Sequence, residues 1–423
     1  MLHSSTFTAP IFRDAICARA ASQRLEIGEG DLSACTTHAV NTQLLVLSFD
    51  YALHQGSIGI SEANQLQAAL QYARANGLPV VFLIESSGIR VTDGTAGIAS
   101  LRRVLRDLMD ARLDGVRLLA MVFKSAFGGA SLLASVCQRR VLHADSLLSM
   151  SGPKLIQQQV GTERFNASDI HAVKALIGGA SRAALSEDVL LMDANVQSYT
   201  TALDDWLAQT PPPLPDFEWL KNQLWLLCAR LPQPLSEPQV LSLPSQLLPS
   251  HTDALLHQVL PVHTGLQMCE DVWTAQDADT RVLALVTPQA CSARDALALT
   301  RELLREYLVM HKRTVLLVDA PGHAATPEDE QPIFSEVLAL LSLAMRSLHR
   351  LGQRVDVVVS GSGGGGIQAA LAAGASSVSM GPQARLYVLP KAAMQALNKV
   401  EDEEAGTLAT ALATGAVDFA FDG

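Results

Sequence analysis

The sequence predicts an α/β protein with two homologous domains in one chain, and three observations support this. Apolar segments typical of buried strands alternate with amphipathic segments typical of helices. Loosely matched segments recur at an offset of about 235 residues, which is too long for a solenoid repeat and fits a duplicated domain. Prolines that break helices and interior strands are concentrated between the two halves. We therefore predict domains at residues 1–205 and 251–423, joined by a proline-rich linker at residues 206–250.

The first half contains the elements of a parallel sheet with helical crossovers. Strand candidates "QLLVLSFDYAL" and "LPVVFLIES" flank a helix candidate, "SEANQLQAALQYARANG", with Ser61 as its N-cap and Gly77 as its C-terminal stop. The amphipathic segment "IASLRRVLRDLMDARLDG" predicts a second helix. The strand "VRLLAMVF", the turn "KSAFGGAS", the helix "LLASVCQ" and the strand "RRVLHADSLLSM" follow. Strands joined by helices are expected to pair in parallel.

The second half repeats this order. A strand "RVLALVT", a helix "SARDALALTRELLREYLVMH", a strand "TVLLVDA" and a helix "PIFSEVLALLSLAMRSLHRLG" lead to the strand "RVDVVVS". A glycine run, a helix "IQAALAAG" and a strand "SSVSM" come next. The dipeptides Pro153-Lys154 and Pro390-Lys391 follow the glycine runs of the two halves at the same distance. A short helix is expected within the linker around "EWLKNQLWLLCARL".

Composition excludes several classes of partner and location. The net charge of −11 argues against broad contact with nucleic acid or an anionic membrane. No apolar run reaches the roughly 20 residues that span a bilayer, and the N-terminus lacks the pattern of a signal peptide. The six cysteines form no CxxC pair and the histidines form no HxH or HExxH spacing. We therefore expect a cytoplasmic protein with reduced thiols, no metal site, and no nucleic-acid or membrane partner.

The two glycine runs are the strongest candidates for a functional site. "FGGAS" at residues 127–131 and "GGGGI" at residues 363–367 each follow a predicted strand and open a predicted helix. Glycine permits close approach of the backbone, and a helix N-terminus offers unpaired N–H groups and a positive dipole end. Such turns can stabilise a developing oxyanion. Turns of this kind also occur for packing alone, and a dinucleotide-binding fingerprint is a weaker alternative because its spacing is not matched.

Longer motifs around these turns resemble a known family. "ESSGIRVTDGTAGIAS" followed by "FGGASLLASVCQRRVLHADSLLSMSGPKLIQQ" resembles the carboxyltransferase branch of the crotonase (ClpP-like) superfamily. By pattern, this half is similar to the β subunits of biotin-independent malonate decarboxylase and of acetyl-CoA carboxylase. The segments "VLLVDAPGHAATPEDEQ" and "VVVSGSGGGGIQAALAAG" are similar to the γ subunit of malonate decarboxylase. The chain thus resembles a fused β–γ pair over about residues 40–175 and 280–395.

The resemblance implies a fold and a reaction. Each domain would be a crotonase-like ββα superhelix. The chain would be a lyase that decarboxylates a malonyl thioester to the acetyl thioester, with the enolate held in backbone oxyanion holes. The substrate would be carried on the phosphopantetheine arm of acyl carrier protein or coenzyme A. No "MKM" biotin site occurs, so no covalently bound cofactor is expected. Other decarboxylase-complex subunits and further copies of the chain are the expected protein partners.

The resemblance also implies site residues. One oxyanion hole would use Gly128 and Gly129 together with the Ser87-Gly88 turn. A second would hold the leaving or transferred carboxylate with Gly365, Gly366 and Gly322. His323 is a candidate proton relay, although a lone histidine more often has no chemical role. Arg90 and Lys154 are candidate substrate-binding residues; an ion pair of Arg90 with Asp93 and an exposed position for Lys154 are the structural alternatives.

Two other functions remain open at this point. A carboxyltransferase would move the malonyl carboxyl to or from a biotin carrier. A non-catalytic paralogue would bind an acyl thioester without turnover, and the sequence favours this where Ser87 replaces a family glycine and Ser362 replaces a family lysine. A crotonase-type hydratase is weaker, because no matched pair of glutamates lies at the two turns.

Overall fold

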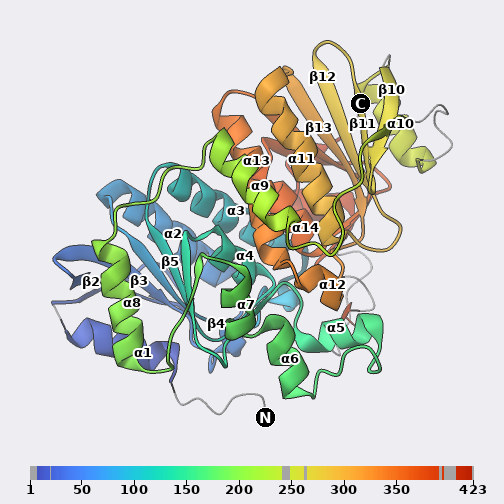
Figure 1. The fold of residues 1–423 in the computed structure, drawn as a ribbon. Coiled ribbons are helices and arrows are strands. Elements are labelled where there is room, and N and C mark those ends of the chain that lie inside the picture. Colours follow the sequence, from blue (N-terminus) through green and yellow to red (C-terminus); the bar gives the residue numbers. More distant parts are fainter. Residues whose placement is uncertain are drawn as a thin grey trace. The chain divides into compact units, whose positions relative to one another are not determined.

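The computed structural model describes residues 7–19, 21–240, 248–261, 264–389, 393–394 and 406–421. It confirms the predicted fold class, because the chain forms two largely parallel β-sheets with helical crossovers (Figure 1). Among these residues no helix combines the length and the apolar character that crossing a membrane requires. The predicted counterpart dipeptide Pro390-Lys391 lies outside the described residues.

The chain packs as two compact units that are not contiguous in sequence. The first contains residues 1–90, 103–214 and 325–336, and the second contains residues 91–102, 215–324 and 337–423. Each unit therefore includes a short segment from the other half of the sequence, which the predicted contiguous domains did not anticipate. The short helix expected in the linker is confirmed as α9 (Phe217–Cys228) and packs in the second unit.

The first unit is built on an eight-stranded sheet. Its first three strands are antiparallel and the others pair in parallel. The order is β1 (Gln23–Arg24), β2 (Ser33–Ala39), β3 (Thr42–Ser48), β4 (Val80–Ser86), β5 (Leu118–Phe127), β6 (Arg139–Leu142) and β8 (Val189–Leu191), with β7 (Leu147–Ser149) pairing with β5.

Helices of the first unit connect and cover this sheet. Helices α1 and α8 pack on this sheet (Figure 1). The buried cluster beneath them includes the aromatic side chains of Phe12, Phe123 and Tyr199. Burial of such rings supplies much of the stability of a core. The helices are α1 (Ala9–Ala18), α2 (Ile60–Asn76), α3 (Gly94–Leu113), α4 (Gly129–Val136), α5 (Pro153–Val160), α6 (Ile170–Ile177), α7 (Gly179–Leu185), α8 (Val196–Ala208) and α12 (Pro327–Glu330); the boundary between the units passes through α3.

The second unit is built on a nine-stranded sheet. The strand order is β17 (Phe419–Ala420), β15 (Ser377–Met380), β14 (Arg354–Gly364), β13 (Arg313–Ala320), β12 (Thr280–Val286), β11 (Val272–Gln276), β10 (Thr264–Cys269) and β9 (Gln239–Val240), with β16 (Arg385–Tyr387) pairing with β14. Its other helices are α10 (Ser250–Val259), α11 (Ala293–Val309), α13 (Phe334–Arg350), α14 (Gly365–Gly374) and α16 (Leu408–Thr414).

The two sheets repeat the same topology strand by strand. Strands β1–β8 and β10–β17 pair in the same order and the same relative directions, and β9 is an addition at one edge. An irregularity in strand pairing, a shift of register, is also repeated. The β4–β5 register shifts between Ile84 and Ser86, and the β13–β14 register shifts between Val318 and Ala320. Both shifts lie just before the glycine turns, so the duplication includes the local geometry of the predicted site.

Two predicted elements differ in detail from the structure. The single strand predicted at "RRVLHADSLLSM" is two strands, because a turn at residues 143–146 redirects the chain from β6 to β7. The hydroxyl of Ser146 accepts the N–H of His143 and donates to its carbonyl, which closes that turn. Helix α3 begins at Gly94 instead of near Ile98.

Candidate functional site

The two predicted turns of the first unit lie against each other. They follow the carboxyl ends of the neighbouring parallel strands β4 and β5. Gly88 has φ +106°, and a Cβ atom there would lie 2.8 Å from the carbonyl oxygen of Phe127. This backbone conformation and this close approach both require glycine. The fold therefore brings the "SSG" and "FGG" turns together.

Gly128 is fixed by hydrogen bonds on both sides. Its backbone has φ +51° and ψ −123°, and its N–H donates to the carbonyl of Met150 at 3.1 Å. Its own carbonyl accepts the hydroxyl of Ser131 at 2.7 Å. Gly129 follows as the first residue of α4, so its N–H has no acceptor within the helix.

The amides of the "SSG" turn also have partners. The N–H of Ser87 donates to the carbonyl of Gln55 at 3.0 Å. The N–H of Gly88 donates to the hydroxyl of Ser86 at 3.1 Å, a bond to a side chain that can rotate. Of the four residues predicted for this hole, Ser87, Gly88 and Gly128 thus donate their amides within the protein, and only Gly88 donates to a side chain.

The second unit repeats the arrangement. Cys291 and His323 form an isolated parallel bridge like that of Ile58 and Ile89 in the first unit. A Cβ atom on Gly364 would lie 2.4 Å from the carbonyl oxygen of Pro321, so the turn before Gly322 contacts the glycine run. Gly365, with φ +59°, is the first residue of α14. The predicted residues of the second hole therefore belong to adjacent turns.

His323 is a buried, neutral member of the second turn. Its Nδ1 accepts the N–H of Gly366 at 3.0 Å, and only 8% of the residue is exposed. Burial lowers the pKa of His323 from 6.5 to about 4. The imidazole therefore carries its proton on Nε2 at neutral pH and stabilises the turn, and any proton relay would have to use Nε2.

The titration of His323 is a direct test of this assignment. The Nδ1 and Nε2 resonances of His323 are expected to show the Nε2–H tautomer and no protonation above about pH 5. Because the folded pKa is lowered, the neutral imidazole stabilises the fold above pH 6.5, and this contribution is lost as the pH falls toward 4. A His323 titration midpoint near 6.5 in ¹⁵N-edited NMR would contradict the assignment.

Arg90 is held in an ion pair within the first unit. Its Nη2 lies 3.0 Å from the carboxylate of Glu62 and 3.7 Å from that of Asp31, and its Nε donates to the hydroxyl of Ser57. Arg90 thus pairs with these two acids, and the alternative pair with Asp93 stays a prediction. Substrate binding by Arg90 would have to compete with them.

Lys154 lies on the surface at the start of α5. It is the second residue of this helix, after Pro153, and its side chain is exposed. Helix α5 begins two residues after Ser151, which belongs to the loop that follows β7. A role for Lys154 in binding the substrate stays a prediction.

Sequence reasoning missed two carboxylates that bind the glycine turns. Asp319, near the end of β13, accepts the N–H of Ser362 at 2.7 Å and contacts Nε2 of His251 at 2.8 Å. Glu330 accepts backbone N–H groups of Met150 and Ser151 beside the first turn. An acidic residue ending an apolar strand could have indicated Asp319, whereas no local pattern separates Glu330 from the acids around it.

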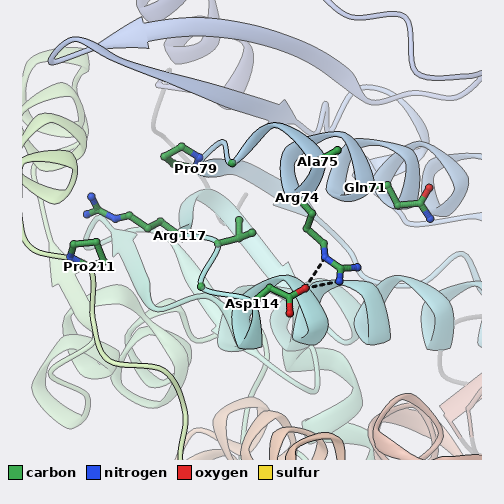
Figure 2. A pocket seen from close by; sticks show the side chains of 10 residues that line it. Gln71, Arg74, Ala75, Pro79, Asp114, Arg117 and Pro211 are labelled. Carbon is green, nitrogen blue, oxygen red and sulfur yellow. Dashed lines mark hydrogen bonds and ion pairs between the residues drawn. The ribbon is translucent and has the colours of Figure 1, made fainter. Parts of the chain in front are cut away.

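The cavity shown in Figure 2 lies at the other end of the first sheet. Pro79 and Arg117, which line it, immediately precede β4 and β5, whereas the glycine turns follow the ends of these strands. The cavity has a volume of about 610 Å³. Both of its guanidinium groups form hydrogen bonds within the protein. Arg74 pairs with Asp114 (Figure 2), and Arg117 donates to the carbonyl of Leu207. We therefore do not place the functional site there.

Comparison with known sequences finds a family match over less than half of the chain. Residues 42–234 match the carboxyl transferase domain family. The chain is 26% identical over 143 residues to the acetyl-coenzyme A carboxylase carboxyl transferase subunit beta of Flavobacteriaceae bacterium (strain 3519-10), covering 33% of this chain and 51% of that protein. It is 25% identical over 129 residues to the malonyl-S-ACP:biotin-protein carboxyltransferase of Malonomonas rubra, covering 29% and 40%. The chain thus spans about half or less of the length of these curated relatives.

Solved structures include similar chains. A chain of a Pseudomonas malonate decarboxylase hetero-tetramer matches 52% of this chain and 89% of its own length, with 18% identity and a TM-score of 0.47. A chain of transcarboxylase 12S matches 98% of this chain and 86% of its own length, with 15% identity and a TM-score of 0.41.

Proposed function

We propose that this chain, whose first half matches the carboxyl transferase domain family, is an enzyme that removes or transfers the carboxyl group of a malonyl thioester. The observation that carries the proposal is the apposition of two glycine turns at the ends of adjacent parallel strands, with a helix N-terminus next to them. The acyl group would be carried on the phosphopantetheine arm of an acyl carrier protein or coenzyme A.

The first unit would polarise the thioester carbonyl. Gly129 offers an N–H without an acceptor in its helix, and Gly88 offers an N–H bound only to the rotatable hydroxyl of Ser86. We therefore assign the oxyanion hole to these two amides, with Ser87 and Gly128 shaping the turns. Fixed donors of this kind stabilise negative charge where it develops, and each is worth about 10²–10³ in rate.

The proposed decarboxylation can be written as a balanced reaction. The bond between the α-carbon and the carboxyl carbon breaks, and its electron pair forms the enolate, whose charge rests mainly on the thioester oxygen. Carbon dioxide leaves, and a proton from solvent on the α-carbon gives the acetyl thioester. In the second unit, the turn formed by Gly322, Gly365 and Gly366 would form a second oxyanion hole; the amide of Gly366 already binds His323, which leaves Gly365 as the donor at the start of α14.

Biotin-independent decarboxylation is the form of the reaction that we favour, because the second half resembles the γ subunit of malonate decarboxylase and the sequence carries no biotin site. Transfer to a biotin carrier is the second candidate, and the similarity to a malonyl-S-ACP:biotin-protein carboxyltransferase supports it. Cytoplasmic location, assembly with further copies and assembly with decarboxylase subunits belong to the same proposal.

Turnover assays separate these possibilities. Malonyl-CoA and malonyl-acyl carrier protein, labelled with ¹³C in the free carboxyl, are incubated with the protein with and without a biotinylated carrier domain. We expect labelled carbon dioxide and acetyl thioester to form without biotin. Label that appears only on biotin would move the assignment to carboxyl transfer. Thioester binding without product in any mixture would identify a non-catalytic protein.

A further inference from the structure

A buried carboxylate contacts the loop behind the first glycine turn. Glu330 ends α12, in the segment 325–336 that packs in the first unit, and its side chain is fully buried. One carboxylate oxygen accepts the N–H of Ser151 at 2.6 Å, and the other accepts the N–H of Met150 at 3.3 Å. Both amides belong to the loop that follows β7. A single side chain thus fixes two successive peptide groups.

The same loop holds the glycine turn. The carbonyl of Met150 accepts the N–H of Gly128 at 3.1 Å, and its sulfur lies 3.2 Å from the hydroxyl of Ser131. Met150 therefore binds Glu330 through its N–H and Gly128 through its carbonyl. Since Gly129 follows Gly128 directly, the direction of the N–H of Gly129 depends on this chain of bonds.

We infer that Glu330 is a positioning residue for the oxyanion hole of the first unit, an inference that rests on the proposed function. Glu330 acts through Met150 and Gly128 and contacts no reacting atom. Two amide N–H donors require two acceptor oxygens in fixed positions, which a carboxylate supplies and a carboxamide of the same shape does not. A displacement of a catalytic group by about 1 Å can lower a rate a hundredfold.

The charge of Glu330 supports this role. Arg182 on α7 lies 3.6 Å from the carboxylate and also donates to the carbonyls of Glu330 and Leu148. Burial raises the pKa of Glu330 to about 7, against the opposing effects of Arg182 and the two amides and with a further increase from Asp329. Because the folded pKa is raised, ionisation of Glu330 reduces the stability of the fold as the pH rises through 7. With a pKa of about 7, Glu330 is a carboxylate with two acceptor oxygens above this pH, and protonation below it turns one of these oxygens into an O–H donor.

The test compares Glu330→Gln with Glu328→Gln. Glu328 lies on the same helix, is exposed and pairs with Arg164, so it is a matched control. In Glu330→Gln the side-chain –NH₂ group, which cannot accept a hydrogen bond, faces one of the two backbone N–H donors. We expect kcat to fall roughly tenfold to a hundredfold with KM changed less than about threefold. The kcat of the unchanged protein is expected to fall as the pH drops through about 7, while that of Glu330→Gln stays low and flat.

A second readout does not depend on activity. Hydrogen–deuterium exchange of the peptides covering residues 125–136 and 147–153 is expected to be faster in Glu330→Gln than in Glu328→Gln. Absence of turnover in the unchanged protein would refute the proposed function, and the exchange data would still decide the structural role of Glu330. Unchanged exchange in both peptides, or an unchanged kcat with only a lower melting temperature, would overturn the inference.

Discussion

Replacement of Gly88 by alanine is expected to lower kcat by roughly 10²–10³, the effect of losing one oxyanion donor. The new Cβ would lie 2.8 Å from the carbonyl oxygen of Phe127, and φ +106° is a conformation that side chains with a Cβ rarely adopt. The backbone must move, which displaces the N–H of Gly88 and the adjoining peptide of Gly128. Steady-state kinetics with the malonyl thioester found active in the turnover assay measure the loss.

Gly77→Ala is the matched control for this variant. Gly77 has φ +63° at the C-terminal end of α2, but a Cβ atom there meets no atom within 4 Å. Alanine at this position should reduce stability by about 1 kcal/mol and leave kcat unchanged. Equal kcat values for Gly88→Ala and Gly77→Ala, with both proteins folded by circular dichroism, would show that the turn is not part of the catalytic site.

Replacement of Arg281 by alanine is expected to destabilise the second unit by about 3–5 kcal/mol, because two buried carboxylates lose their buried counter-ion. Arg281 donates to Glu302 at 2.6 Å and to Glu306 at 2.7 Å, and both carboxylates are almost fully buried. Burial alone would raise the pKa of Glu306, but the bonds from Arg281 and His311 outweigh it, so the pKa is lowered. Glu306 therefore stabilises the fold above the ordinary carboxyl pKa, and this contribution is lost as the pH falls.

Urea unfolding of Arg281→Ala and Arg305→Ala at pH 7 measures this difference. Arg305 bonds to the same carboxylate of Glu302 at 2.9 Å, but its side chain is 44% exposed. Its removal is expected to change the free energy of unfolding by less than about 1 kcal/mol. Similar values for the two variants would show that burial of the Arg281 network does not control the stability of the second unit.

The candidate site could be predicted from the sequence only in part. The glycines at positions 88, 128 and 365 have positive φ angles, and this requirement is visible in the sequence because no other residue meets it readily. The hydrogen-bond acceptor of each turn amide could not be predicted from the sequence. Ser87 donates to Gln55 and Gly366 donates to His323, and these partners come from loops that no periodicity connects. Glu330 lies 180 positions from Met150 in the sequence, so only packing could reveal their contact.

The sequence by itself determined the duplicated order of strands and helices and the positions of the glycine turns. Side-chain periodicity and backbone freedom are local properties, so the secondary structure of each segment can be predicted from its own residues. The tertiary structure alone decided the exchange of short segments between the two units and which turn amides keep free hydrogen-bonding capacity. A buried donor or acceptor that loses water must find a partner within the protein, and the sequence does not say which donor meets which acceptor.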